Sequence, residues 1–268
     1  MYPEHSGAVV EAGSIPELDS LVEREQNLIP FGNGRSYGDS ALSDLVVDMR
    51  KLNYFLEFDE ANGRMRVQAG VLLADILKVG LPKGWFLKIT PGTKLITVGG
   101  AIAADVHGKN HHVDGCFSES VESLKLMLPD RRIVTCSRTF NPRIFKATCG
   151  GMGLTGVILE ATIVLKPVTS SSIEQTTIKT SNLQETFDAF EKYAESPYSV
   201  AWIDCLARKK HLGRSLLMVG DFATDSKLSY EPGKMVNIPF TLPSFLLNKL
   251  TVRMFNWFYY NRVRKEVS

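Results

Sequence analysis

Short apolar runs alternate with glycine-containing turns along the first half of the chain, a pattern that predicts strands. We expect these strands at Leu28–Phe31, Leu45–Met49, Phe55–Phe58, Met65–Gln68, Val121–Leu128 and Arg132–Thr135. Asn62-Gly63 joins the third run to the fourth and is the dipeptide typical of a tight hairpin turn. Most of this half is strand, turn and short helix, so we predict an α+β fold.

Two helices are expected among these strands. Ser14 and Glu17 have the spacing of a capping box, which predicts a helix over Ile15–Arg24. A second helix should cover Val71–Val79, and we expect it to end at Gly80–Pro82.

A proline and a Thr/Ser run interrupt the pattern at Lys166–Ser172 and indicate a domain boundary. We therefore predict one domain over residues 1–168 and a second, smaller one over residues 169–268. In the second domain we expect strands at Ile173–Lys179, Ser199–Cys205 and Leu216–Val219, with a helix after the first of them. This β-α-β-β order predicts a small α+β domain.

The helix of the second domain should begin at the capping pattern Ser181-x-x-Gln184. The apolar face that we expect it to bury carries Leu183, Phe187, Phe190 and Ala194. Thr224–Pro239 is polar and predicts a mobile loop, whereas Phe240–Tyr260 is apolar and aromatic. A packed amphipathic helix is the favoured interpretation of this last stretch, and a surface that contacts lipid or a lipid-like substrate is the alternative.

Composition excludes several classes of protein. The net charge is +2 and 22% of the residues are charged, so nothing suggests a nucleic-acid partner. The four cysteines are scattered without a CxxC pair, which is typical of a reducing compartment rather than of a disulfide framework. Neither a signal-peptide pattern nor an apolar run long enough to span a membrane is present. We expect a cytoplasmic protein, for which peripheral contact with a membrane stays open.

The stretch from Pro91 to His112 dominates the functional reading. Its glycines and alanines leave a backbone with almost no side chains, on which a large flat molecule can lie. His107, Lys109 and His112 then supply polar groups at the edge of such a surface. We interpret the stretch as the bed of a flat redox cofactor, with His107 at the chemistry because imidazole exchanges a proton near neutral pH.

A second glycine-rich segment, Gly32–Asp39, follows a predicted buried strand. Its three glycines expose consecutive backbone N–H groups, and Arg35 and Ser36 add donors, so phosphate binding is favoured over an ordinary turn. It is not a Walker loop, because no Gly-Lys-Ser/Thr follows. Gly151–Gly156 matches GxGxxG, but Val157–Leu165 after it is rich in β-branched residues and predicts a strand. A Rossmann dinucleotide site needs a helix there, so we reject it.

The histidine cluster also suggests a metal site. His107, His111, His112 and Cys116 lie close in sequence, with Asp105 and Asp114 nearby. Gly108 and Asn110 argue for a loop rather than a helix, and no further ligand group follows downstream. We therefore expect no metal; merely structural histidines are the remaining alternative to an active-site role.

Three motifs in this order carry a resemblance to a known family: GNGRSYGD at 32–39, PGTKLITVGGAIAADVHGKNHH at 91–112 and CGGMGLTGVILEATI at 149–163. Together they resemble the vanillyl-alcohol-oxidase (PCMH) type of FAD flavoprotein, and most of all members that oxidise a polyprenyl-phosphate-linked ribose. The resemblance implies an FAD-binding domain of two α+β subdomains followed by a substrate or cap domain.

The resemblance also implies which residues hold FAD. The pyrophosphate would be cradled by Gly32, Asn33, Gly34, Arg35, Ser36, Tyr37 and Gly38. The flavin would be lined by Gly92, Thr93, Thr97, Val98, Gly99, Gly100, Ala104, Asp105, Val106 and His107. Gly156 and Ile158 would lie towards the adenine side or the ribityl chain. Many relatives attach FAD through a histidine in the first loop; Tyr37 and its neighbours stand there instead, so we predict non-covalent FAD.

The implied reaction removes a proton from the ribose 2-hydroxyl and passes a hydride from its carbon to flavin N5. His107 and Lys109 would orient the sugar and its phosphate and stabilise the charge on reduced flavin, with Tyr37 against the ring. The implied partners are a polyprenyl-phosphate-linked sugar, an NAD-dependent short-chain reductase that returns the ketone to the inverted alcohol, and quinone or O2 as electron acceptor.

Two other functions remain open at this point. An FAD-dependent oxidase of alditols or sugar lactones would keep the flavin and change the substrate. A non-catalytic flavin-binding remnant is the third, because family members are longer and their C-terminal part returns to the FAD domain with a lysine and a tyrosine. We therefore expect this chain to hold only part of the substrate domain.

Overall fold

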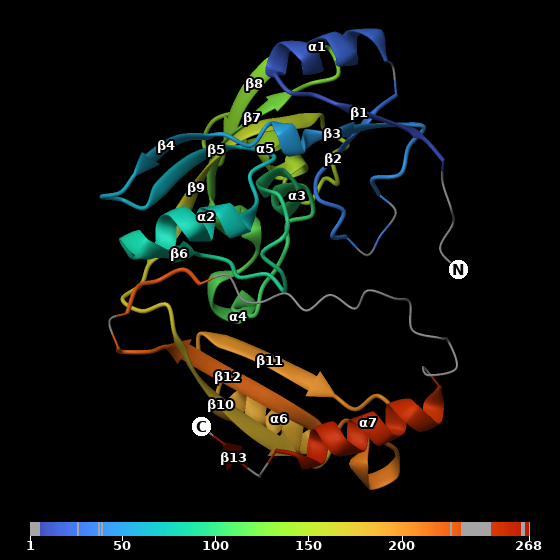
Figure 1. Ribbon diagram of the computed structural model, residues 1–268, viewed down its shortest axis with the longest axis vertical. Helices are drawn as coiled ribbons and strands as arrows, with labels where there is room; N and C mark the ends of the chain where they lie inside the picture. Colours follow the sequence, from blue (N-terminus) through green and yellow to red (C-terminus); the bar gives the residue numbers. More distant parts are fainter. Residues whose placement is uncertain are drawn as a thin grey trace. The chain divides into compact units, whose positions relative to one another are not determined.

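The computed structural model describes residues 6–25, 27–36, 38, 40–225, 227–231, 248–263 and 266–267 (Figure 1). The chain divides into two compact units, residues 1–168 and 169–268. The division follows Pro167, the last residue of a long strand, and lies in the segment rich in Thr and Ser. Both units combine helices with sheets, which confirms the α+β fold class.

The first unit begins with a three-stranded parallel sheet in the order β1-β3-β2. Its strands are β1 (Ala8–Glu11), β2 (Ile29–Phe31) and β3 (Leu45–Asp48), and helix α1 (Ile15–Arg24) connects the first two. Leu18 and Leu21 of α1 are buried in one apolar cluster with Val47 of β3. This packing holds the helix over the small sheet (Figure 1).

Helix α1 has the predicted bounds. The Ser14 hydroxyl accepts a hydrogen bond of 3.3 Å from the backbone N–H of Glu17. The Glu17 carboxylate in turn accepts from the N–H of Gly13 rather than from that of Ser14. The cap is therefore a variant of the capping box, shifted by one residue on its acidic side.

A larger antiparallel sheet follows, in the order β4-β5-β9-β7-β8. Its strands are β4 (Phe55–Asp59), β5 (Arg64–Gln68), β7 (Val121–Met127), β8 (Ile133–Ser137) and β9 (Val157–Pro167), and β6 (Trp85–Leu87) pairs with the far end of β9. Strand β9 is the centre of the unit, because it pairs with β5, β6 and β7. The Asn62-Gly63 hairpin joins β4 to β5 as predicted.

Short helices surround this sheet. They are α2 (Leu73–Gly80), α3 (Val98–Ala103), α4 (His111–Asp114) and α5 (Pro142–Thr148), with 3₁₀ turns η1 (Met49–Lys51), η2 (Leu81–Lys83) and η3 (Phe117–Ser120). Helix α2 ends at Gly80, as predicted, and the separate 3₁₀ turn η2 follows it through Pro82. The turn ends at Gly84, whose φ of 82° is the left-handed conformation that suits glycine.

The strand predicted after the GxGxxG match is confirmed, since β9 and not a helix follows Gly156. Gly156 has a φ of 141°, and a Cβ there would lie 2.3 Å from the carbonyl oxygen of Met127 on β7. This glycine therefore allows a close approach between neighbouring strands.

The second unit is an antiparallel sheet in the order β11-β12-β10-β13. Its elements are β10 (Ile173–Thr180), α6 (Leu183–Lys192), β11 (Tyr198–Ile203), η4 (Lys209–His211), β12 (Ser215–Phe222), α7 (Lys249–Asn261) and β13 (Glu266–Val267). The β-α-β-β order is confirmed. Its core cluster contains Ala189 of α6 and Leu217 and Val219 of β12.

Two predictions about the helices of this unit are wrong. Helix α6 is capped by Asn182, not by Ser181, and it buries Thr186 and Ala189. The small Ala189 lets the helix approach the sheet, and the Thr186 hydroxyl bonds with Thr180 and Ser215 inside it. The predicted apolar face is left outside: Leu183, Phe187 and Phe190 are 40%, 53% and 37% exposed.

Helix α7 also differs from the packed amphipathic helix that we expected. It buries Asn256 and Tyr260 and exposes most of its apolar side chains, because the sheet beneath it offers polar partners. Residues 240–247 and most of the predicted loop Thr224–Pro239 lie outside the described residues. In the part of the chain that the structure describes, no helix combines the length and the apolar character needed to cross a membrane.

Candidate functional site

Helix α3 is the floor of the candidate site. The buried Thr97 caps it, since its hydroxyl accepts a 3.1 Å hydrogen bond from the N–H of Gly100. The N–H groups of Val98 and Gly99 donate at 2.8 Å to the carbonyls of Val71 and Ala69. A Cβ on Gly99 would lie 2.9 Å from the Ala69 Cβ, so this side of the helix is packed. Gly100 on the other side is exposed.

The glycine loop after β2 lies against the start of α3. A Cβ on Gly32 would lie 2.4 Å from the Thr97 hydroxyl, and the Asn33 amide donates to the Leu95 carbonyl at 2.8 Å. Two segments 62 residues apart are thereby joined. Gly34, Arg35, Ser36 and Gly38 are exposed around this junction. Tyr37 lies outside the described residues.

The segment before α3 is open. Gly92 is exposed, and a Cβ built there would have no atom within 4 Å. Thr93 is exposed too, and its hydroxyl accepts a 3.2 Å hydrogen bond from the N–H of Leu95. A flat molecule beside α3 would meet no side chain at Gly92, whereas at Gly100 the Thr97 hydroxyl would lie 3.0 Å from a built Cβ.

The C-terminal end of α3 is fixed by the turn that contains Gly150 and Met152 and by Asp105. The N–H groups of Gly150 and Met152 donate to the carbonyls of Ile102 and Ala103 at 3.0 and 2.8 Å. Asp105 has a φ of 40°, and its carboxylate accepts from the N–H and the hydroxyl of Ser118 at 2.8 and 3.1 Å. The predicted residues Ala104, Asp105 and Val106 thus form the turn that leads from α3 to His107.

The loop that carries His107 and Lys109 is held by a buried asparagine that the sequence did not single out. Asn110 is 0% exposed. Its side-chain oxygen accepts from the N–H of Thr90 at 3.1 Å, and its amide donates to the Lys88 carbonyl at 2.7 Å and to Asp114 at 2.6 Å. The N–H of Lys109 adds a 3.1 Å bond to the Thr90 carbonyl.

Gly108 allows the close contact between this loop and Thr90, because a Cβ on Gly108 would lie 2.3 Å from the Thr90 carbonyl oxygen. The side chains of His107 and Lys109 on either side of it are exposed. The loop is therefore fixed through its backbone and presents its imidazole and its ammonium group to solvent.

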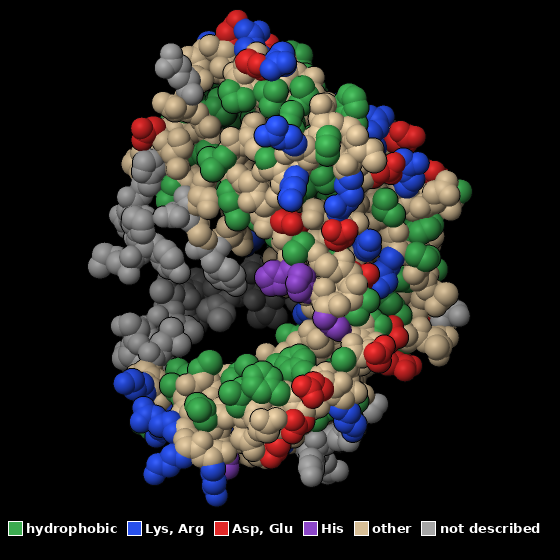
Figure 2. Space-filling view, turned by 180° about the vertical axis from the view of Figure 1, so that it is seen from behind, with side chains coloured by type: hydrophobic (Ala, Val, Ile, Leu, Met, Phe, Trp, Pro, Cys, Tyr) green, Lys and Arg blue, Asp and Glu red, His purple; other side chains and the backbone are tan. Residues whose placement is uncertain are grey.

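The histidines lie together at the surface of the first unit (Figure 2). The rings of His107 and His111 meet edge to face at 5.7 Å, and the Cys116 sulfur lies 3.8 Å from Nδ1 of His111. Burial raises the pKa of the Cys116 thiol, and the negative charges of Asp105 and Glu119 raise it further. The thiol therefore stays protonated near neutral pH. Within the described residues, no three His, Cys, Asp or Glu side chains are arranged to hold a metal ion.

Gly156 and Ile158 are placed differently from the other predicted residues. Both lie at the start of the central strand β9 or just before it, and Ile158 is buried opposite Leu126 of β7. Helix α3 packs against β9, so Ile158 belongs to the wall behind the floor rather than to its open face.

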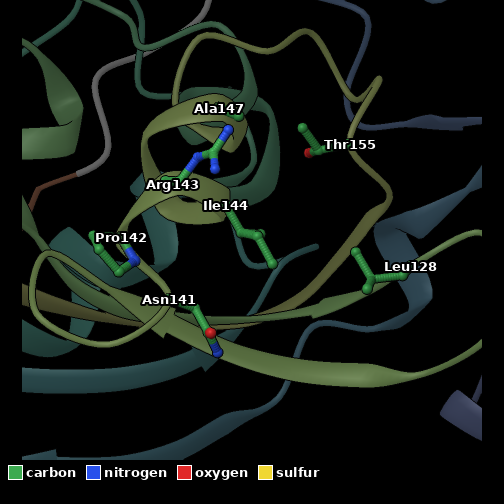
Figure 3. Close-up of a pocket in the computed structure, with 7 residues that line it drawn as sticks. All are labelled: Leu128, Asn141, Pro142, Arg143, Ile144, Ala147 and Thr155. Atoms are coloured by element: carbon green, nitrogen blue, oxygen red, sulfur yellow. The ribbon is translucent and has the colours of Figure 1, made fainter.

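A surface hollow of about 700 Å³ lies elsewhere on the first unit (Figure 3). It is lined by Leu128, Asn141, Pro142, Arg143, Ile144, Ala147 and Thr155. None of the predicted site residues lines it, and the Thr155 hydroxyl is already bonded to Thr148. We therefore assign it no part in the candidate site.

Comparison with known proteins decides the family. Residues 7–137 match the FAD binding domain family, and the chain is 37% identical over 247 residues to decaprenylphosphoryl-β-D-ribose oxidase of Mycolicibacterium smegmatis. Residues 7–137 therefore form an FAD-binding domain of this family. It is also 30% identical over 169 residues to L-gulonolactone oxidase of Mus musculus and 28% identical over 177 residues to D-lactate dehydrogenase of Anaerostipes hadrus.

The coverage of these relatives is uneven. The ribose oxidase alignment covers 85% of this chain, and the other two cover 62% each. The chain spans 53% of the ribose oxidase, 38% of the gulonolactone oxidase and 37% of the lactate dehydrogenase. It thus spans about half the length, or less, of the relatives that it matches.

The cofactor of the domain is FAD, and the residues present fit it. The open position at Gly92 and the exposed Gly100, which has no side chain, leave room for a flat ring above α3. The Thr90 hydroxyl beside the histidine loop is buried without a hydrogen-bond partner among the described residues, as expected of a group that a ligand satisfies. Arg35 is exposed and would supply a cation for a diphosphate.

Proposed function

We propose that the protein oxidises the 2-hydroxyl of a polyprenylphosphoryl-ribose to the keto sugar, the first half of an epimerisation to arabinose. The proposal rests mainly on the extent of the alignment with the ribose oxidase. It covers 85% of the chain, whereas the first unit makes up residues 1–168 of 268, so the similarity must continue into the second unit. In this proposal the second unit, residues 169–268, contributes to substrate binding.

FAD would be held non-covalently. The loop Gly32–Gly38 would take the diphosphate, and Gly92–Thr93, Thr97–Gly100 and Ala104–His107 would line the ring, with Gly156 and Ile158 behind them. When bound, FAD supplies the two-electron acceptor for a hydrogen on the alcohol carbon. The bare face of α3 would cover one side of that ring, and the bonds of the helix to Thr97 and Ala69 would hold it in place.

His107 and Lys109 would position the sugar and its phosphate. Both side chains are exposed on a loop whose backbone is fixed by Thr90, so the backbone of the loop loses little freedom when they bind. The Lys109 ammonium would pair with the substrate phosphate, and His107 would bond the reacting hydroxyl. We keep Tyr37 as a proposed contact of the ring, although it lies outside the described residues.

The partners follow from the same reaction. The substrate would be a polyprenyl-phosphate-linked sugar, and quinone or O2 would accept the electrons. An NAD-dependent short-chain reductase would consume the keto sugar. Since a polyprenyl chain resides in a bilayer, we also propose peripheral contact with a membrane.

A second candidate is oxidation of a free alditol or sugar lactone. It is favoured by the 30% identity to L-gulonolactone oxidase and the 23% identity to D-arabinono-1,4-lactone oxidase of Candida glabrata. Lys109 argues for the phosphate-linked sugar, because a free polyol or lactone presents no anion to it.

The absorption spectrum of the purified chain with FAD, before and after acid precipitation, tests the cofactor part. A two-band flavin spectrum whose colour leaves with the supernatant is expected; colour in the pellet would contradict non-covalent binding. Anaerobic bleaching by a polyprenyl phosphoribose but not by xylitol or gulonolactone is the expected outcome for the substrate. Bleaching by the free compounds alone would favour the second candidate, and a colourless chain would favour a non-catalytic remnant.

A further inference from the structure

Helix α7 is attached to its sheet by polar contacts. The buried amide of Asn256 donates to the Asp204 carboxylate at 2.6 Å, and the Tyr260 hydroxyl donates to the Thr180 carbonyl at 2.9 Å. Arg214 pairs with Asp204 at 2.6 Å and lies over the Tyr260 ring at 4.7 Å. These contacts fix which side of the helix faces the sheet.

The opposite side is apolar and open. Leu250, Met254, Trp257 and Phe258 are 66%, 63%, 61% and 64% exposed, and their spacing of four, seven and eight residues places them in one stripe. A helix of a water-soluble domain normally turns such a stripe inward. A contiguous exposed apolar patch of this kind marks an interaction surface.

The surroundings of the stripe are basic. Between Lys249 and Asn261 the helix has no acidic residue, and its Lys249 and Arg253 are exposed, as is Arg262 just after it. The η4 turn lies beside the helix, since the residues that flank the turn, Asp204 and Arg214, contact α7 (Figure 1). Arg208, Lys209 and Lys210 of that turn are exposed, and basic side chains gather at one end of the second unit (Figure 2).

Helix α6 of the same unit makes an informative contrast. It also exposes an apolar stripe, Leu183, Phe187 and Phe190, but its exposed charged residues are the acidic Glu185, Asp188 and Glu191 and a single base, Lys192. An anionic lipid surface would repel this face and attract that of α7. The two helices therefore differ in charge while sharing apolar exposure.

We propose that the exposed face of α7 docks on a bilayer that contains anionic lipid. Trp257 and Phe258 would enter the headgroup region, where aromatic rings are favoured, and the basic residues of α7 and η4 would bind lipid phosphates. This inference rests on the proposed membrane contact and assigns it to a surface; it does not depend on flavin chemistry.

Vesicle sedimentation of the full chain tests the proposal. The protein should bind vesicles of phosphatidylcholine with phosphatidylglycerol and bind pure phosphatidylcholine vesicles far more weakly, and added salt should release it. The double variant Trp257→Ser/Phe258→Ser should bind at least about tenfold more weakly, because two large apolar side chains no longer enter the lipid.

The matched control is Phe187→Ser/Phe190→Ser on α6, which should bind vesicles like the unchanged chain. Neither double variant touches Asn256 or Tyr260, so circular dichroism should show that both remain folded. Equal binding of the α7 variant, or no binding to anionic vesicles by the unchanged chain, would overturn the proposal. So would a dimer in solution that the α7 variant dissociates, because the stripe would then serve a second copy. The flavin spectrum should be the same in all variants, which separates this test from that of the reaction.

Discussion

The side-chain oxygen of Asn110 accepts a 3.1 Å hydrogen bond from the backbone N–H of Thr90, twenty residues earlier in the chain. This contact fixes the position of the His107–Lys109 loop relative to the segment that leads into α3. Asn110 is fully buried, and its amide group is also hydrogen-bonded. The Asn110 side chain is therefore held in one position by all of its partners.

Replacing Asn110 with alanine should therefore weaken FAD binding and stability together. The partly buried N–H of Thr90 would lose its acceptor, which costs about 1–3 kcal/mol. FAD titration by fluorescence quenching and thermal unfolding without FAD measure the two effects. Asn110→Asp is the informative companion, because it keeps the acceptor but sets a carboxylate beside Asp114, which lies 2.6 Å away. Its defect should be larger at neutral than at acidic pH; a defect independent of pH would contradict this role of the amide.

Gly99 and Gly100 form a matched pair on the two sides of α3. Gly99→Ala should destabilise the chain even without FAD, because its Cβ would lie 2.9 Å from that of Ala69. Gly100→Ala should change stability by less than about 1 kcal/mol, since alanine favours a helix and meets only the Thr97 hydroxyl at 3.0 Å. Its methyl group should instead lower the affinity for FAD. Thermal unfolding without cofactor and FAD titration distinguish the two; equal FAD affinity in Gly100→Ala would remove this face from the binding site.

His107→Ala and Lys109→Ala should slow flavin reduction by the phosphate-linked sugar by about a hundredfold or more. The bound flavin should keep its spectrum, because both side chains point to solvent from a loop held by its backbone. Rapid-mixing absorbance under anaerobic conditions measures the rate. Lys146→Ala, an exposed position on α5, serves as the control. Unchanged rates in both variants would exclude these residues from the reaction.

The attachment of α7 to its sheet should be sensitive to acid, because it depends on the Asp204 carboxylate. Burial acts to raise the pKa of its carboxyl, but hydrogen bonds from Arg214 and Asn256 outweigh it and hold the pKa below its ordinary value of about 3.9. A lowered folded-state pKa stabilises the fold above the unfolded value, and this contribution is lost as the pH falls through the folded value. Asp204→Asn should thus lower the melting temperature at pH 7 and should flatten its decline below about pH 4. If the melting temperatures of the unchanged chain and of Asp204→Asn fell in parallel with decreasing pH, the result would argue against a stabilising role of the ion pair.

Local signals in the sequence were sufficient for much of the fold. The Asn62-Gly63 turn and the Ser14 cap are contacts between residues a few positions apart, so the hairpin and α1 follow from their own sequences. The first strand, β1, was missed, because its four residues carry almost no periodicity and are fixed by parallel pairing with β3. Helix α5 was missed for a similar reason, as it is short and begins at Asn141-Pro142, which reads as a turn.

The orientation of the helices in the second unit was not accessible from the sequence. A periodic pattern shows that α6 and α7 are amphipathic but not which face the sheet accepts. The sheet presents the hydroxyls of Thr180 and Ser215 and the carboxylate of Asp204, and these select Thr186 and Asn256. Such a choice depends on partners distant in sequence.

In the candidate site, too, some features follow from local sequence and others from contacts between distant residues. Its glycines were recognisable from composition, since Gly32, Gly92 and Gly100 lie in short segments rich in glycine. Asn110 was not, because its importance arises from Lys88 and Thr90, which the fold brings beside it.

The position of β9 has a consequence for the order in which the FAD domain is made. This strand lies between β5 and β7, and α3 packs on it, yet it is the last strand of the first unit to be synthesised. The turn that holds the end of α3, at Gly150 and Met152, also comes late. A nascent chain that has already released both glycine-rich segments from the ribosome therefore still lacks the wall behind them. The surface that would hold FAD therefore cannot form fully before Pro167 has emerged.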